Sequence, residues 1–224
     1  MSDDREADAD RLSARALSRD DPTGWFEQLY AEAAAGSAVV PWDRAQPQYL
    51  VEGWLREHAD RAVGQGALVV GCGFGRDSES AAQLGWDVTA FDISATAVAQ
   101  AGLRHPDSPV TYVAADLLDP PTQWRRAFDL VVESMNVQAL PLPLRRTACA
   151  QVASFVGAGG RLLVVAAARP GEDTDVSGPP WPFSRSDIDA FSVDGMDLVT
   201  VDLIPDPAAP DVQRWRAEFR RPEQ

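Results

Sequence analysis

Lysine is absent from this sequence, so all 20 basic residues are arginine. Without lysine the chain cannot carry a Walker-type phosphate loop, a pyridoxal Schiff base or a lysine nucleophile. Cysteine is also scarce, because only Cys72 and Cys149 occur. Two cysteines do not make a disulfide framework and they fit a reducing compartment, so we expect a cytoplasmic protein in which both thiols are buried and inert.

Long apolar runs are missing as well. No stretch reaches the ~18 apolar residues of a membrane helix, and the N-terminus lacks the hydrophobic core of a signal peptide. No cluster of histidine, cysteine and acidic residues suggests a metal. The formal net charge of -14 disfavours binding to nucleic acid or to anionic membranes. We therefore expect a monomer or homodimer that is soluble and acts on small molecules.

The length of 224 residues suits one α/β domain. Residues 1–20 are rich in Asp, Arg, Ala and Ser, which predicts a flexible acidic tail or a short surface helix. Residues 21–224 are expected to form the single domain. Aromatic and apolar residues recur at helical spacing early in this domain, so residues 21–62 are predicted to be an N-terminal helical cap.

A strand, a glycine-rich turn, a helix and a second strand are predicted in residues 67–94. Residues 67–70 are all apolar, as in a strand that is buried on both faces. The turn that follows contains three residues that let the backbone bend tightly, Gly71, Gly73 and Gly75. The second strand, 87–91, ends on Asp92. Because open α/β sheets bind ligands at the carboxyl ends of their strands, we expect a ligand between the turn and Asp92.

The spacing of the glycines separates two classes of cofactor. A dinucleotide fingerprint needs a third glycine at position 76, which is Arg76 here. The pattern G-x-G-x-G, with Asp92 after the second strand, resembles motif I of the class I S-adenosylmethionine-dependent methyltransferases. The resemblance implies that the glycine turn holds the amino-acid end of S-adenosylmethionine and that Asp92 holds its ribose hydroxyls.

Further strands are predicted at 110–114, 128–133, 161–167, 198–203 and 214–220, the last two as an antiparallel pair around a Pro-rich excursion. The expected fold is therefore α/β, a Rossmann-like sheet of seven strands. The sheet would be mostly parallel, with helices on both faces and an antiparallel C-terminal strand. The methyltransferase fold has this arrangement.

Two further motifs support the resemblance. Asp116 and Leu117 follow the third strand and resemble motif II, whose residues hold the adenine. The run Phe-Asp-Leu-Val-Val at 128–132 resembles the fourth-strand motif of the family, and the residues after it normally face both cofactor and substrate. The resemblance covers about residues 22–220.

Two segments point to one branch of the family. Tyr30 and the Pro-Trp-Asp sequence around Trp42 resemble the cap of the thiopurine, thiocyanate and halide methyltransferases. The Pro-rich segment 178–184 resembles their Gly-Pro-Pro-Phe-Pro sequence, so 168–185 is interpreted as a lid over the acceptor. The cofactor-binding residues are then expected to be Trp42, Gly71, Cys72, Gly73, Gly75, Asp77, Asp92, Ile93, Asp116, Leu117 and Glu133. The acceptor is expected to contact Tyr30, Met135, Asn136, Trp181 and Phe183, with Tyr30, Trp42 and Asn136 positioning the reactants.

The residues favour a soft acceptor for the methyl group. His58 and His105 end helices away from the expected pocket, which weakens an O-methyltransferase with a histidine base. A thiol with a pKa of about 8.5 needs little help to ionise. We therefore expect a thiol or another soft nucleophile, and N- or O-methylation of a small metabolite is the alternative. A nicotinamide-dependent oxidoreductase and a non-catalytic S-adenosylmethionine-binding protein also stay open.

Overall fold

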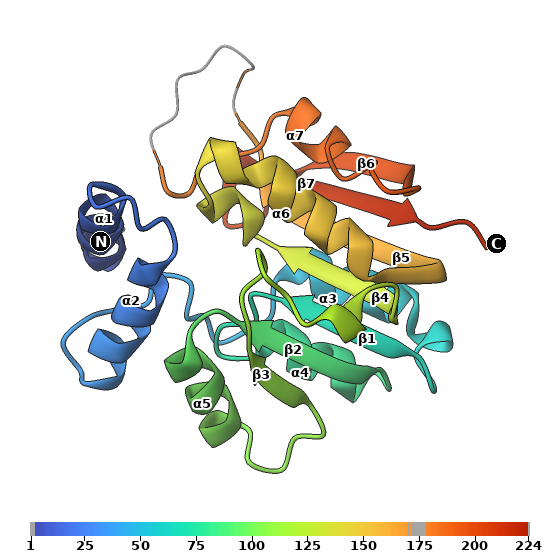
Figure 1. Cartoon of the computed structure of the whole chain (residues 1–224), viewed down its shortest axis with the longest axis horizontal. Coiled ribbons are helices and arrows are strands. Elements are labelled where there is room, and N and C mark those ends of the chain that lie inside the picture. Colours follow the sequence, from blue (N-terminus) through green and yellow to red (C-terminus); the bar gives the residue numbers. More distant parts are fainter. Residues whose placement is uncertain (1–2, 170, 172–177, 224) are drawn as a thin grey trace.

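The computed structural model describes residues 3–169, 171 and 178–223. Its centre is a seven-stranded sheet in the order β3-β2-β1-β4-β5-β7-β6 (Figure 1). The strands are β1 Gly66–Val70, β2 Asp87–Asp92, β3 Thr111–Ala114, β4 Phe128–Ser134, β5 Val156–Ala167, β6 Asp197–Asp206 and β7 Ala209–Arg220. Strands β1 to β5 pair in parallel, whereas β7 runs antiparallel to β5 and to β6. The predicted fold is confirmed.

Helices cover both faces of the sheet (Figure 1). They are α1 Asp3–Leu17, α2 Gly24–Ala34, α3 Tyr49–Glu57, α4 Arg76–Gln83, α5 Ala95–Arg104, α6 Leu142–Phe155 and α7 Arg185–Asp189. Short 3-10 turns lie at η1 Ala59–Arg61, η2 Thr122–Trp124 and η3 Val137–Ala139. The helix boundaries follow from local signals such as Ser94, which caps α5 by accepting a hydrogen bond from the Ala97 N–H.

The two core layers follow from the alternation of side chains along each strand. On β4, Val131 packs with residues of α6, while Leu130 and Val132 pack with residues of α3 and α4 on the other face. Because both faces are covered, residues 67–70 of the central strand β1 are all apolar and buried, as the sequence predicted. Burial of each such side chain contributes about 1.5–3 kcal/mol.

A third cluster joins the N-terminal cap to the glycine turn. Its members include Leu12 of α1 with Trp25 and Leu29 of the cap, and they pack with Phe74 of the turn and Ala97 of α5. Figure 1 shows α2 between α1 and α5 at the edge of the sheet. The cap is thus packed directly against the predicted ligand site.

Of the two alternatives for residues 1–20, a flexible tail or a short surface helix, the described part of the segment has the helix. Residues 3–17 form α1. Leu12 of this helix is only 1% exposed, because it packs against Trp25 and Leu29 of α2. Arg11 pairs with Glu32 of α2 at 2.9 Å, and Asp8 accepts a hydrogen bond from the Val39 N–H at 3.0 Å. A few apolar positions were enough to dock this helix because α2 offers an apolar face.

Two other boundaries differ from the prediction. Strand β5 begins at Val156, directly after α6, so the glycines at 157–160 lie inside the strand. A Cβ on Gly160 would lie 2.9 Å from the Phe128 carbonyl oxygen, so glycine permits the close approach of the two strands. The Pro-rich segment near 207–208 is a tight hairpin between β6 and β7 and not an excursion. Of the expected lid, residues 170 and 172–177 lie outside the described residues.

The packing of α1 can be tested by shortening its central apolar side chain. The substitution Leu12→Ala should lower the free energy of unfolding by about 2–4 kcal/mol, because it leaves a cavity between α1 and α2. Leu103→Ala is the matched control, since Leu103 is 72% exposed and its loss should cost less than about 0.5 kcal/mol. Urea unfolding measures both. Equal values for the two variants would mean that α1 does not pack on the cap.

Candidate functional site

The glycine turn after β1 is closely surrounded by side chains from other elements. Gly71, Gly73 and Gly75 have φ angles of +61°, +51° and +87°. A Cβ at these positions would lie 2.3 Å from the Asn136 side chain, 2.9 Å from the Tyr30 hydroxyl and 2.2 Å from the Tyr112 hydroxyl, respectively. Both the backbone conformation and the space therefore require glycine. Two of the three neighbours, Tyr30 and Asn136, were predicted site residues.

Asp92 lies at the end of β2 and faces this turn. Its Oδ2 accepts a hydrogen bond from the Gly73 N–H at 2.9 Å, and its Oδ1 accepts one from the Ser94 N–H at 2.9 Å. The side chain is 7% exposed, and burial raises its pKa to about 6 although both hydrogen bonds lower it. The structure thus brings the predicted acid and the glycine turn together, with Ile93 half-buried beside them.

Other predicted acids lie at the carboxyl ends of neighbouring strands. Asp77 accepts a hydrogen bond from the Gln48 N–H at 2.7 Å, and burial raises its pKa to about 6. Asp116 follows β3 and accepts one from the Leu118 N–H at 2.8 Å. Leu117 next to it is buried in the core. This concentration of acidic groups suits a cationic ligand.

Glu133, a predicted cofactor contact, lies at the end of β4 and is enclosed by the protein. The side chain is fully buried, and burial raises its pKa to about 7. Its Oε1 accepts hydrogen bonds from the Asn136 N–H at 2.9 Å and the Val137 N–H at 2.7 Å. Glu133 therefore shapes the loop that carries Asn136 to the glycine turn.

The cap places two aromatic residues, Tyr30 and Trp42, beside the glycine turn. The Trp42 indole N–H donates a hydrogen bond to the Tyr30 hydroxyl at 2.7 Å. Tyr30 is buried, and its ring meets Phe74 of the glycine turn edge-on at a centroid distance of 5.1 Å. Burial raises the pKa of Tyr30 well above its usual value, so the phenol is neutral at pH 7. Trp42 is 40% exposed, and its ring meets the rings of Trp25 and Tyr30 edge-on.

Met135 occupies a strained position after β4. Its φ angle is +63°, which is uncommon for a long side chain, and its N–H donates to the Val165 carbonyl at 2.8 Å. Its sulfur lies 3.8 Å from Nη1 of Arg214, a residue of β7 that the sequence did not single out. Arg214 also pairs with Asp206 at 3.0 Å. No local motif marks Arg214, because β7 reaches this edge of the sheet only through its pairing with β5.

The two cysteines are not reactive thiols. Burial, together with the charge of Asp92, raises the pKa of Cys72 well above its usual value. Cys149 lies on the buried face of α6, where burial raises its pKa to about 12. Raised pKa values favour the protonated form of both thiols at neutral pH.

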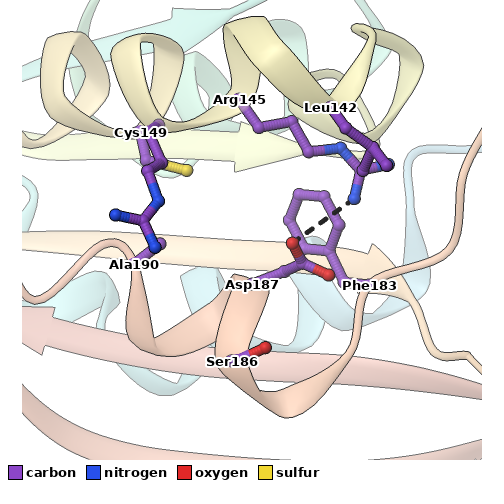
Figure 2. A pocket seen from close by; sticks show the side chains of 8 residues that line it. Leu142, Arg145, Cys149, Phe183, Ser186, Asp187 and Ala190 are labelled. Carbon is purple, nitrogen blue, oxygen red and sulfur yellow. Dashed lines mark ion pairs between the residues drawn. The ribbon is translucent and has the colours of Figure 1, made fainter. Parts of the chain in front are cut away.

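Phe183, a predicted acceptor contact, is fully buried and lines a cavity between α6 and α7. Its ring packs against Phe191 and lies 5.0 Å below the Arg145 guanidinium. Figure 2 shows this region between α6 and α7, where Arg145 and Asp187 form an ion pair at 3.4 Å beside a cavity of about 160 Å³. Arg145 also donates to the Trp181 carbonyl at 2.6 Å. This cluster fixes the end of the expected lid and shares no residue with the glycine turn.

The described residues show neither a cluster of metal-ligating side chains nor a membrane-spanning helix. Within residues 3–169, 171 and 178–223, no group of three His, Cys, Asp or Glu side chains is arranged to hold a metal ion. No helix in the described part of the chain is both long and apolar enough to span a membrane.

Comparison with known proteins agrees with this geometry. The sequence model of a family described as "Methyltransferase domain" matches residues 67–160. A search of curated proteins found no match to the chain.

Solved structures show the same fold at low sequence identity. The protein solved for "conversion of a disulfide bond into a thioacetal group during echinomycin biosynthesis" is 22% identical with a TM-score of 0.70, covering 88% of this chain and 91% of its own. The N-methyltransferase NodS from Bradyrhizobium japonicum WM9, solved with S-adenosylhomocysteine, is 20% identical with a TM-score of 0.67, covering 88% and 100%. The 1,6-didemethyltoxoflavin-N1-methyltransferase of Burkholderia thailandensis is 18% identical with a TM-score of 0.64, covering 94% and 89%. Residues 67–160 of this chain thus match a methyltransferase-domain model, and the chain has the fold of these solved methyltransferases.

Proposed function

We propose that this enzyme transfers the methyl group of S-adenosylmethionine to a small-molecule acceptor, preferably a thiol or another soft nucleophile. The observation that carries the proposal is the hydrogen bond from the Gly73 N–H to Asp92. It places a buried carboxylate beside a turn that has no side chains of its own at three positions. A ligand with both a zwitterionic end and a sugar fits these two neighbouring features.

The residues present fit S-adenosylmethionine. The glycine turn would hold the methionine part and Asp92 the ribose hydroxyls, while Asp116 and Leu117 would flank the adenine. The cofactor carries a cationic sulfonium, and the acidic groups at this edge favour a cation. When bound, the cofactor supplies a methyl group on an excellent leaving group.

The chain's own residues then act by positioning. Methyl transfer is an in-line displacement, so holding the acceptor at near-attack distance and excluding water supply most of the catalysis. Trp42 offers an aromatic face to the sulfonium, and its indole N–H fixes the Tyr30 hydroxyl above the turn. Asn136, held by Glu133, faces the turn from the opposite side.

The positions of the two histidines support an acceptor atom that needs no histidine base. His58 Nδ1 donates a hydrogen bond to the Trp54 carbonyl at 2.9 Å and the His58 ring stacks on the Trp54 ring, while His105 lies at the C-terminal end of α5. Neither histidine contacts Tyr30, Trp42 or Asn136 in the described contacts. An acceptor that ionises easily, such as a thiol, needs no such base.

N-methylation of a small molecule is the second candidate. NodS and the toxoflavin enzyme are N-methyltransferases, whereas the protein of echinomycin biosynthesis acts on a disulfide. A panel of thiols, halides, amines and phenols with labelled S-adenosylmethionine separates the candidates. We expect the highest kcat/KM with a thiol. Labelling of amines alone would replace the thiol proposal with N-methylation.

The role of Asp92 can be tested through pH. Its ionised form accepts hydrogen bonds from sugar hydroxyls, so the affinity for S-adenosylhomocysteine should be constant above pH 7 and fall as the pH drops through about 6. Asp92→Asn should weaken binding at pH 8 by roughly 1–3 kcal/mol and remove this pH dependence. Calorimetric titration measures both effects, with Asp119→Asn at an exposed acid as the control. An unchanged affinity in Asp92→Asn would refute the ribose role.

The stability of the cofactor-free protein should change with pH in the opposite direction from the affinity for S-adenosylhomocysteine. Burial raises the pKa of Asp92 in the folded state, so the folded state binds this proton more tightly than the unfolded state does. Stability should therefore increase as the pH falls from about 6 towards 4, and Asp92→Asn should reduce this increase. Thermal unfolding of the wild type and of Asp92→Asn between pH 4 and 8 measures this change in stability. A wild-type protein that loses stability over this range to the same extent as the variant would contradict the assignment.

Trp42 should matter more for turnover than for folding. Trp42→Ala should lower kcat/KM by about tenfold or more, because cation–π contacts with a desolvated cation contribute about 2 kcal/mol. The melting temperature should change little, since the side chain is 40% exposed. Trp42→Phe, which keeps a ring but loses the hydrogen bond to Tyr30, should retain part of the activity. Normal methylation by Trp42→Ala would remove this residue from the site.

A further inference from the structure

Helix α5 is attached to the N-terminal cap at both of its ends. At its N-terminus, Glu27 of α2 accepts hydrogen bonds from Ser94 and Thr96. At its C-terminus, Arg104 pairs with both carboxylate oxygens of Asp43 at 2.9 and 3.0 Å. The Arg104 guanidinium also lies 3.5 Å above the ring of Phe74 in the glycine turn. The cap is thus fixed to the element that directly follows Asp92.

Both carboxylate oxygens of Glu27 accept short hydrogen bonds from the start of α5. Its Oε2 accepts from the Ser94 hydroxyl at 2.6 Å and from the Thr96 N–H at 3.1 Å, and its Oε1 accepts from the Thr96 hydroxyl at 2.6 Å. Burial raises the pKa of Glu27, but the hydrogen bonds from Ser94 and Thr96 outweigh it and lower the pKa overall. Glu27 is therefore an ionised carboxylate at the N-terminus of α5, where the helix dipole favours a negative charge.

Ser94 links this carboxylate to Asp92. The Ser94 residue is fully buried, its hydroxyl donates to Glu27, and its backbone N–H donates to Asp92 Oδ1 at 2.9 Å. The same hydroxyl accepts the Ala97 N–H at 3.0 Å. With its hydroxyl fixed on both sides, Ser94 cannot shift without moving the N–H that orients Asp92.

We propose that Glu27 is a positioning residue for cofactor binding, which acts through Ser94 on the Asp92 carboxylate. Docking of the cap and binding of the cofactor then stabilise each other, because both depend on the same orientation of residues 92–94. This inference rests on the proposed function, in which Asp92 holds the ribose. The charge of Glu27 alone acts in the other direction, since it raises the pKa of Asp92. A loss of affinity on neutralising Glu27 therefore reports its positioning role.

The experiment compares Glu27→Gln with Glu32→Gln by calorimetric titration of S-adenosylhomocysteine at pH 8. Glu32 is a matched control, because it lies on the same helix and pairs with Arg11 and Gln28 but not with α5. Glu27→Gln should weaken binding by about 5- to 10-fold, within the usual range of coupling between sites. Glu32→Gln should stay within about twofold of the wild type.

A double-mutant cycle separates positioning from a general effect on folding. In an Asp92→Asn background the same Glu27→Gln change should alter the affinity by less than about twofold, because the group that it orients is gone. An equal loss in both backgrounds would overturn the inference, as would an unchanged affinity in Glu27→Gln alone. If Glu27→Gln does not fold, Thr96→Val removes only the hydroxyl contact with Glu27 and should weaken binding in the same direction.

Amide hydrogen exchange tests the reverse effect, which is whether cofactor binding stabilises the docking of the cap. Binding of S-adenosylhomocysteine should slow the exchange of amides in α2 of the wild type and slow it less in Glu27→Gln. Exchange in α2 that does not respond to the ligand would contradict the coupling. Failure of the wild type to bind S-adenosylhomocysteine would instead refute the proposed function itself, so the two failures are distinguishable.

Discussion

The hydrogen bond between the Gly73 N–H and Asp92 is the contact on which the candidate site depends. It joins the turn after β1 to the end of β2, and it forms only because three glycines with positive φ bring the backbone close. The carboxylate is held in a buried position, which raises its pKa to about 6. The cap, the loop after β4 and the start of α5 all pack around this contact. The site is therefore pre-organised by backbone geometry more than by any one reactive side chain.

The fold and the centre of the site could be predicted because their signals are local. A few neighbouring residues are enough to predict each of these features. They are the apolar strand at 67–70, the glycine turn at 71–75 and the acid Asp92 at the end of the next strand. Parallel strands end at the same edge, so the order of elements also placed Asn136 near the turn. Tyr30 was expected from the resemblance alone, and the structure places its hydroxyl beside Gly73.

The remaining features depend on contacts between distant parts of the chain. Arg214 reaches Met135 only because β7 inserts beside β5, and Glu27 meets Ser94 across 67 positions. The burial of Phe183 between α6 and α7 does not follow from the Pro-rich motif around it. The composition of residues 1–20 left a flexible tail and a surface helix open, and the packing of Leu12 against α2 selects the helix. Composition alone does not reveal such a partner.

A crystal structure of the protein with S-adenosylhomocysteine tests the central claim most directly. We predict that the methionine part lies along residues 71–75, that the ribose hydroxyls lie within hydrogen-bond distance of the Asp92 carboxylate, and that Trp42 faces the sulfur. A ligand bound elsewhere, or a glycine turn that stays filled by the side chains of Tyr30 and Asn136 at saturating ligand, would contradict the account.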